Sequence, residues 1–186
     1  TGGAGFLGTA LCNRLARQGH TVRALDDCSN GDPSGLVSQV NFVKGDVNDK
    51  PLLWQLLQDI DCVYHLAALV SVPESSLFPS EYNRINVNGT VNLMEAIRDA
   101  KVRRIVFASS GAIYGQLDHV PYSESDEVKP GSPYAVSKLA AEHYVSTLGG
   151  LYGIETVSLR IFNAYGPGQE LPPSYPPVIP QLLKQA

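Results

Sequence analysis

Three glycines near the start of the chain constrain its fold more than any other feature. The first eight residues read Thr-Gly-Gly-Ala-Gly-Phe-Leu-Gly, which spaces Gly2, Gly5 and Gly8 by three. Glycine lets the backbone turn tightly and approach a pyrophosphate closely, and a helix that begins there presents its N-terminal N–H groups to the phosphates. Leucines recur at every fourth residue up to Leu15, which predicts such a helix. Glycine spacing alone is weak, so the interpretation needs an acidic residue about 20 positions later.

An acidic residue is present at the required distance. Residues 21–25 predict a short strand, and Asp26 stands at its end. A carboxylate there can accept both ribose hydroxyls of an adenosine, and it would repel a 2′-phosphate, so NAD is favoured over NADP. The strand expected before the glycines is not in the sequence, which begins at Thr1. We therefore expect the chain to be a fragment that lacks the central first strand.

Strand and helix patterns alternate along the rest of the chain, which predicts an α/β fold with a three-layer, Rossmann-type, doubly wound parallel sheet. We interpret residues 1–186 as one NAD-binding domain, in which residues 163–186 begin the substrate-binding portion and the C-terminal substrate lobe is missing. His65, inside an apolar strand, is interpreted as a packed core histidine. Strands are expected at 40–43, 62–67, 104–108 and 155–162, and helices from Pro51, over 79–100, over 134–148 and from 181.

Composition narrows the class of partner. The net charge is −4 and no run of basic residues is longer than Arg103-Arg104, so nucleic acid is not expected. No apolar run reaches the roughly 18 residues of a membrane span, and no membrane partner is expected. The three cysteines are odd in number and lack Cys-x-x-Cys spacing. They predict reduced thiols in a cytoplasmic protein, without a disulfide framework or a metal site.

Tyr134 and Lys138 form the clearest catalytic pair. They are four residues apart in Ser-Pro-Tyr-Ala-Val-Ser-Lys, so a helix would place both side chains on one face. Ser132 suits the N-cap of that helix and Pro133 its first turn. A nearby ammonium favours the phenolate and lowers the tyrosine pKa, which makes such a pair a sensible general base.

Taken together, these motifs resemble the extended short-chain dehydrogenase/reductases, the NAD-dependent epimerase/dehydratase family, and within it most closely the UDP-hexose 4-epimerases. The likeness covers essentially the whole chain and depends on several motifs in family order. They are the glycine loop at 2–8, Asp26, Gly45-Asp46-Val47, His65-Leu66-Ala67-Ala68, Asn86-Val87-Asn88-Gly89-Thr90, Ser109-Ser110 to Tyr114-Gly115, Tyr134 with Lys138, and Arg160-Ile161-Phe162-Asn163.

The resemblance implies a role for each matching residue. Ser110, Tyr134 and Lys138 would be the catalytic residues. The cofactor NAD would be bound by Gly2, Gly5, Phe6, Leu7, Gly8, Asp26, Asp46, Val47, Leu66, Ala67, Ala68, Asn86, Ser109, Tyr134 and Lys138. A UDP-sugar substrate would contact Ser110, Ala112, Tyr134 and Asn163.

One departure from the family pattern favours epimerisation. Family dehydratases carry acidic residues directly after the catalytic Ser or Thr, whereas this chain has Gly111 and Ala112. The expected reaction is therefore reversible epimerisation of a nucleotide sugar at C4, through a transient 4-keto intermediate. A nucleotide-sugar dehydrogenase or reductase, or a dehydratase, is the alternative, and a non-catalytic dinucleotide sensor is a third. The resemblance also implies a homodimer of the whole protein, paired through helices 79–100 and 134–148.

Overall fold

Parallel strands and helices alternate through the computed structural model of the chain, which describes residues 1–169 and 177–185. In this part, none of the helices is both long enough and apolar enough to cross a membrane. The strands are β1 (Val22–Asp26), β2 (Val40–Lys44), β3 (Cys62–His65), β4 (Arg104–Ser110) and β5 (Glu155–Ile161). The helices are α1 (Phe6–Arg17), α2 (Lys50–Leu56), α3 (Val72–Leu77), α4 (Pro79–Tyr82), α5 (Gly89–Asp99), α6 (Pro133–Tyr152) and α7 (Val178–Gln185).

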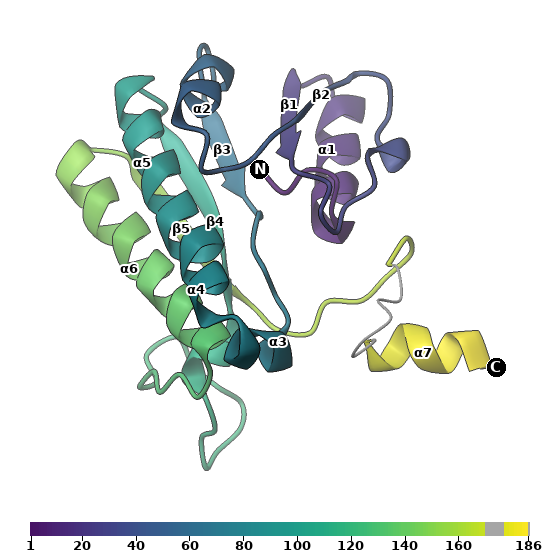
Figure 1. The fold of residues 1–186 in the computed structure, drawn as a ribbon, viewed down its shortest axis with the longest axis vertical. Helices are drawn as coiled ribbons and strands as arrows, with labels where there is room; N and C mark the ends of the chain where they lie inside the picture. Colours follow the sequence, from purple (N-terminus) through teal and green to yellow (C-terminus); the bar gives the residue numbers. More distant parts are fainter. Residues whose placement is uncertain (170–176, 186) are drawn as a thin grey trace.

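The strands form two parallel sheets, with orders β1-β2 and β3-β4-β5. The predicted α/β class with parallel strands is confirmed, but the strands do not make one continuous sheet. The backbone of residues 1–3 joins the two sheets: the Thr1 nitrogen donates to Tyr64 O (2.8 Å), Leu66 N donates to Thr1 O (3.1 Å), and Gly3 N donates to Leu25 O (3.2 Å). Figure 1 shows this N-terminal stretch between β1 and β3.

The largest apolar core lies where helices α2, α5 and α6 pack on the three-stranded sheet. Figure 1 shows α5 and α6 side by side across that sheet. The burial alternates along β4, because successive side chains of a strand point to opposite faces. The most deeply buried members of this core are Leu53, Leu93, Met94, Ile97, Ile105, Phe107, Ala141 and Val145.

Helix α6 is longer than predicted. The sequence analysis ended this helix before Gly149 and Gly150, whereas it runs to Tyr152 and ends at Gly153, whose φ of +69° is left-handed. Gly149 is not a stop signal, because it lies where the helix packs against β5. A Cβ at Gly149 would lie 2.2 Å from the Cγ2 atom of Thr156, so only glycine allows this close approach.

The segment expected as one helix over 79–100 is continuous but not uniform. Between α4 and α5 it contains a π-helical stretch, Asn83–Asn88. Such π-bulges often mark functional sites, and this one carries the buried Asn86. Helix α3, which precedes it, was not predicted; Ser71 caps it by accepting a hydrogen bond from Glu74 N. Helix α7 begins at Val178, three residues before the expected start.

Candidate active site

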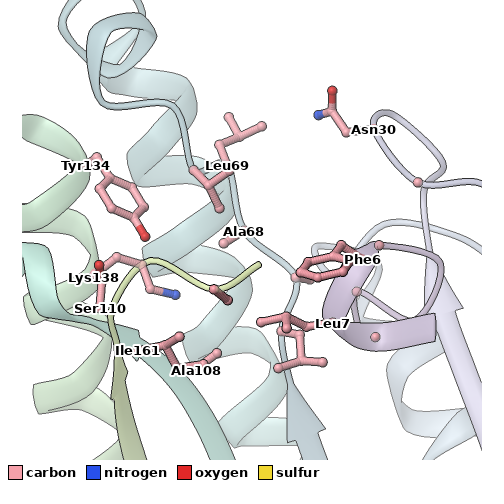
Figure 2. Close-up of a pocket in the computed structure, with 18 of the residues that line it drawn as sticks. Phe6, Leu7, Asn30, Ala68, Leu69, Ala108, Ser110, Tyr134, Lys138 and Ile161 are labelled. Carbon is pink, nitrogen blue, oxygen red and sulfur yellow. The ribbon is translucent and has the colours of Figure 1, made fainter. Parts of the chain in front are cut away.

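A cleft of about 980 Å³ lies where the carboxyl ends of the strands meet the glycine loop and the first turns of α6. In a parallel α/β fold, this edge of the sheet is where ligands bind. Figure 2 shows Phe6 and Leu7 on one side of the cleft and Ser110, Tyr134 and Lys138 on the other. Every residue predicted to bind or react lines this cleft except Asn86. The residues brought together are Gly2, Gly5, Phe6, Leu7, Gly8, Asp26, Asp46, Val47, Leu66, Ala67, Ala68, Ser109, Ser110, Ala112, Tyr134, Lys138 and Asn163.

Gly2 and Gly8 are packed so closely in the glycine loop that a side chain at either position would clash. Gly2 has a φ of +70°, and a Cβ there would lie 2.5 Å from Ala67 N. A Cβ at Gly8 would lie 1.9 Å from the carbonyl oxygen of Gly2. Helix α1 begins directly after Gly5, its N-cap, which makes no side-chain cap. The first-turn N–H groups of α1 therefore face the cleft without a side chain over them, as a phosphate site requires.

Asp26 connects the glycine loop to the turn that follows β1. Its Oδ2 accepts a hydrogen bond from Ala4 N (3.0 Å), and its Oδ1 accepts one from Cys28 N (2.9 Å). These two bonds fix the carboxylate at the edge of the cleft. Asn30 and Gly31, from the same turn, also line the cleft, although the sequence analysis did not select them.

Tyr134, Ser110 and Lys138 come together at the opposite side of the cleft. Figure 2 shows the Tyr134 hydroxyl pointing toward the side of the cleft that holds Ser110 and Lys138. Ser132 caps α6 by accepting a hydrogen bond from Ala135 N, as predicted, and thereby fixes the turn that carries Tyr134. Lys138 is only 3% exposed, and its Nζ lies 4.4 Å from the centre of the Phe107 ring.

The pKa values of this pair differ from the expectation drawn from sequence. Burial raises the pKa of Tyr134 above its ordinary value, and the nearby Ser110 hydroxyl opposes this rise only in part. Burial also lowers the pKa of Lys138 to about 7, against the attraction of Glu142, so the lysine is not a permanent positive charge at neutral pH. The protein without its cofactor therefore favours a neutral phenol, and the predicted lowering of the tyrosine pKa is not seen in it.

Asn86 lies behind the cleft and holds one of its walls. Its amide is 1% exposed. The Oδ1 atom accepts from Leu69 N (2.8 Å), and Nδ2 donates to Leu69 O (3.0 Å) and to Ser137 Oγ (2.9 Å). Asn86 thereby joins the segment after β3 to helix α6, and the structure places it as a support for the residues that line the cleft.

Two further residues from the sequence analysis have clear positions. His65 is 1% exposed, with Nδ1 2.7 Å from Thr1 Oγ1 and Nε2 2.9 Å from Thr90 Oγ1. Burial holds the pKa of His65 well below the ordinary value, which agrees with a neutral core histidine. Ser109 lines the cleft, but its hydroxyl donates to the Glu142 carboxylate at 2.5 Å.

Several cleft residues were missed by the sequence analysis. They lie within a few residues of predicted positions, either in the last part of a strand or in the loop that follows it, and carry no motif of their own. Gln169 is the most informative of them, because its Oε1 is buried without a hydrogen-bond partner among the residues that the structure describes. Such an oxygen is a candidate to accept a hydrogen bond from a ligand. The missed lining residues include Asn30, Gly31, Leu69, Val70, Ala108, Ile161, Tyr165 and Gln169.

The glycine loop, the strand-end acid and the Ser-Tyr-Lys group define a dinucleotide-binding protein of the short-chain dehydrogenase/reductase type. The profile of the NAD dependent epimerase/dehydratase family matches residues 1–186, and the chain belongs to that family.

Curated and solved relatives agree with this assignment. The UDP-glucose 4-epimerase of Mycolicibacterium smegmatis is 41% identical over 177 residues, which cover 91% of this chain and 56% of the relative. The structure of a UDP-N-acetylglucosamine 4-epimerase from Methanobrevibacter ruminantium aligns with a TM-score of 0.93 and 35% identity, over 98% of this chain and 60% of that one. The structure of the Thermus thermophilus UDP-glucose 4-epimerase in complex with NAD aligns with a TM-score of 0.87 and 39% identity. The alignment covers 91% of this chain and 56% of that one. The chain thus spans a little over half the length of these relatives.

Proposed function

We propose that the protein is an NAD-dependent epimerase that inverts C4 of a UDP-hexose of the UDP-glucose/UDP-galactose type. The observation that carries the proposal is the grouping of Ser110, Tyr134 and Lys138 in one cleft with the glycine loop of a dinucleotide site. A non-catalytic dinucleotide sensor would need the loop but has no use for these three side chains together. The names of the relatives support the choice of substrate.

The residues of the cleft fit NAD on their own geometry. The glycine loop leaves no room for a side chain at Gly2 or Gly8, no side chain caps the first turn of α1, and Asp26 stands at the end of β1. Lys138 is buried and makes no hydrogen bond to any residue that the structure describes, as expected of an ammonium that binds ribose hydroxyls. When bound, NAD supplies the hydride acceptor and a cationic ring.

Each catalytic side chain then has one task. Tyr134, as the phenolate, takes the proton from the 4-hydroxyl of the sugar. Ser110 hydrogen-bonds the same oxygen and stabilises the charge that develops on it. Lys138 would hold the ribose of bound NAD and, as an ammonium, would favour the phenolate. Oxidation at C4 gives a 4-keto sugar, which turns over in the cleft, and reduction on the opposite face gives the epimer.

The position after Ser110 argues against loss of water as the main reaction. Gly111 occupies the position at which family dehydratases carry an acid. A Cβ at Gly111 would lie 2.7 Å from two atoms of the Phe162 ring, so a carboxylate side chain has no room there unless that ring moves. The positions directly after Ser110, Gly111 and Ala112, therefore supply no acid to protonate a leaving hydroxyl.

The proposal is tested by incubating the protein, at its full encoded length, with NAD and a panel of UDP-hexoses. We expect the 4-epimer to form with no net NADH, which chromatography of the sugars and absorbance at the NADH band would show. Steady NADH formation would instead identify a dehydrogenase, and a product lighter by one water would identify a dehydratase. Binding of NAD with no turnover of any UDP-hexose would favour the non-catalytic dinucleotide sensor over an enzyme. Light scattering of the same sample tests the homodimer that we propose for the whole protein.

A further inference from the structure

A second cluster of polar side chains lies directly behind the catalytic group. Ser109, Glu142 and Arg160 come from β4, α6 and β5, respectively. The Ser109 hydroxyl donates to Glu142 Oε2 at 2.5 Å, and Arg160 Nη2 donates to Glu142 Oε1 at 2.8 Å. Arg160 Nη1 also donates to the Tyr114 hydroxyl at 2.7 Å, and the guanidinium lies 4.9 Å from the centre of that ring. Two strands of the sheet therefore hold the Glu142 carboxylate at once.

The cluster joins the two elements that carry the catalytic side chains. Ser109 directly precedes Ser110 on β4, and it is the register partner of Arg160 on β5. On α6, Glu142 follows Lys138 by four residues, just as Lys138 follows Tyr134 by four, so the three share one helix face. A change in the position of Glu142 would consequently move the end of β4 relative to the turns of α6 that hold Tyr134 and Lys138.

Burial separates this ion pair from the surface pairs of the protein. The side chains of Arg160 and Glu142 are 22% and 13% exposed. Arg104 of β4 and Glu155 of β5 also form an ion pair, at the other end of these strands, but its side chains are 54% and 65% exposed. Exposed pairs contribute about 0–1 kcal/mol, whereas removing one partner of a shielded pair has a larger effect because the other charge loses its compensation.

Glu142 also bears on the charge of Lys138. Its carboxylate raises the pKa of Lys138 against the lowering by burial. The other titratable groups around the ammonium are neutral near pH 7: His65 on β3 has a pKa well below its ordinary value, and Tyr134 has one above. Arg160 lies on the far side of Glu142. In the described part of the chain, Glu142 is thus the anion that favours the charged lysine.

We propose that Glu142 is a positioning residue for the active site: held by Ser109 and Arg160, its carboxylate fixes α6 against the end of β4 and keeps Lys138 as an ammonium. The part of this proposal that concerns turnover rests on the proposed function, whereas the part that concerns cofactor binding does not.

The test compares Glu142→Gln with Glu155→Gln in the protein at its full encoded length. Glutamine keeps the size of the side chain, removes its charge and replaces one acceptor oxygen by an amide NH2. Glu155 provides the same change in an exposed ion pair, which joins β5 to β4. NAD affinity is measured by calorimetry between pH 6 and 9, with turnover and urea unfolding measured in parallel. In Glu142→Gln, we expect the pH at which NAD affinity declines to fall by roughly one unit and kcat to fall more than KM changes. Glu155→Gln should leave the pH profile unchanged.

A merely structural role would lower the unfolding free energy of Glu142→Gln and leave both pH profiles in place, and that result would overturn the proposal. If Glu142→Gln does not fold, Ser109→Ala serves instead, because it removes one hydrogen bond to the carboxylate. We then expect a smaller downward shift of the pH at which NAD affinity declines. An unchanged pH profile of NAD affinity would again overturn the proposal. The two proposals fail separately. A wild-type protein that turns over no UDP-hexose contradicts the proposed function, while its NAD affinity profile still decides the role of Glu142.

Discussion

The ammonium of Lys138 lies 4.4 Å from the centre of the Phe107 ring, in a site where the lysine is 3% exposed. A cation over an aromatic face gains some electrostatic energy, but this gain does not compensate for the lost hydration of a buried charge. Burial accordingly lowers the pKa of Lys138 to about 7. The protein keeps a destabilising group at the point where the proposed reaction needs a positive charge.

Lys138→Met should make the cofactor-free protein more stable near neutral pH. An unfolded lysine has a pKa of about 10.4, so between about pH 7 and that value the unfolded state binds more protons and stability rises with pH. An apolar side chain has no charge to bury, so the substitution should raise the free energy of unfolding at pH 7 by up to about 4 kcal/mol. It should also remove the increase of stability with pH. Urea unfolding at pH 7 and pH 10 measures both effects. Lys44→Met, at an exposed lysine, is the control. If the unfolding free energy of the wild type and of Lys138→Met changed equally with pH, burial of the Lys138 charge would not explain the pH dependence.

Tyr134→Phe should abolish the chemistry and keep the cofactor. The phenol is the proposed base, and the loss of a positioned base costs about 10²–10⁴-fold in rate. NAD affinity should stay within a few-fold of the wild-type value, because the ring remains in place. Tyr144→Phe is the matched control, since this tyrosine lies on the same helix and is 45% exposed. Turnover near that of the wild type in Tyr134→Phe would rule out the mechanism.

Asn86→Ala should destabilise the fold and weaken NAD binding together. The substitution leaves the Leu69 N–H and the Leu69 carbonyl without their partner and removes one of the two hydrogen bonds of the Ser137 hydroxyl. Each buried group left unpaired costs about 1–3 kcal/mol, so we expect a loss of at least about 2 kcal/mol. Asn92→Ala, which removes a single bond to Asn48, should cost less in urea unfolding. An Asn86 variant as stable as the Asn92 variant would show that the amide is not the support described above.

The neighbouring glycines of α6 should respond to alanine with opposite signs. A Cβ at Gly150 would meet nothing within 4 Å, and alanine is favoured over glycine in a helix by about 0.5–1 kcal/mol, so Gly150→Ala should stabilise. A Cβ at Gly149 would lie 2.2 Å from Thr156 Cγ2, so Gly149→Ala should destabilise by about 1 kcal/mol or more, because β5 has to shift. Thermal unfolding of the two variants measures both changes in stability. A Gly149→Ala variant more stable than the wild type would show that β5 does not pack closely against Gly149.

The same pair of glycines illustrates the limits of the sequence pattern. Two adjacent glycines usually end a helix, and nothing in the local sequence indicates that strand β5 approaches Gly149. The glycine loop, Asp26 and the Tyr134 helix could be predicted because their signals are local: spacing, a strand end, a capping serine. The support of the cleft by Asn86, in contrast, depends on contacts between distant segments. The pKa of Tyr134 went in the unexpected direction for a similar reason, because burial is a property of the whole fold.

The short backbone stretch between the two sheets also has a consequence for how the protein opens. The Thr1 nitrogen is hydrogen-bonded to Tyr64 of β3, its carbonyl to Leu66 directly after β3, and Gly3 to Leu25 of β1, so the start of the loop that would cradle the phosphates is joined to both sheets. Main-chain hydrogen bonds thus form this tether between the glycine loop and the two sheets. Slow amide exchange at Leu66 and Gly3 would mark this tether as the stiffest part of the molecule, and ligands would enter by movement of the outer loops around it.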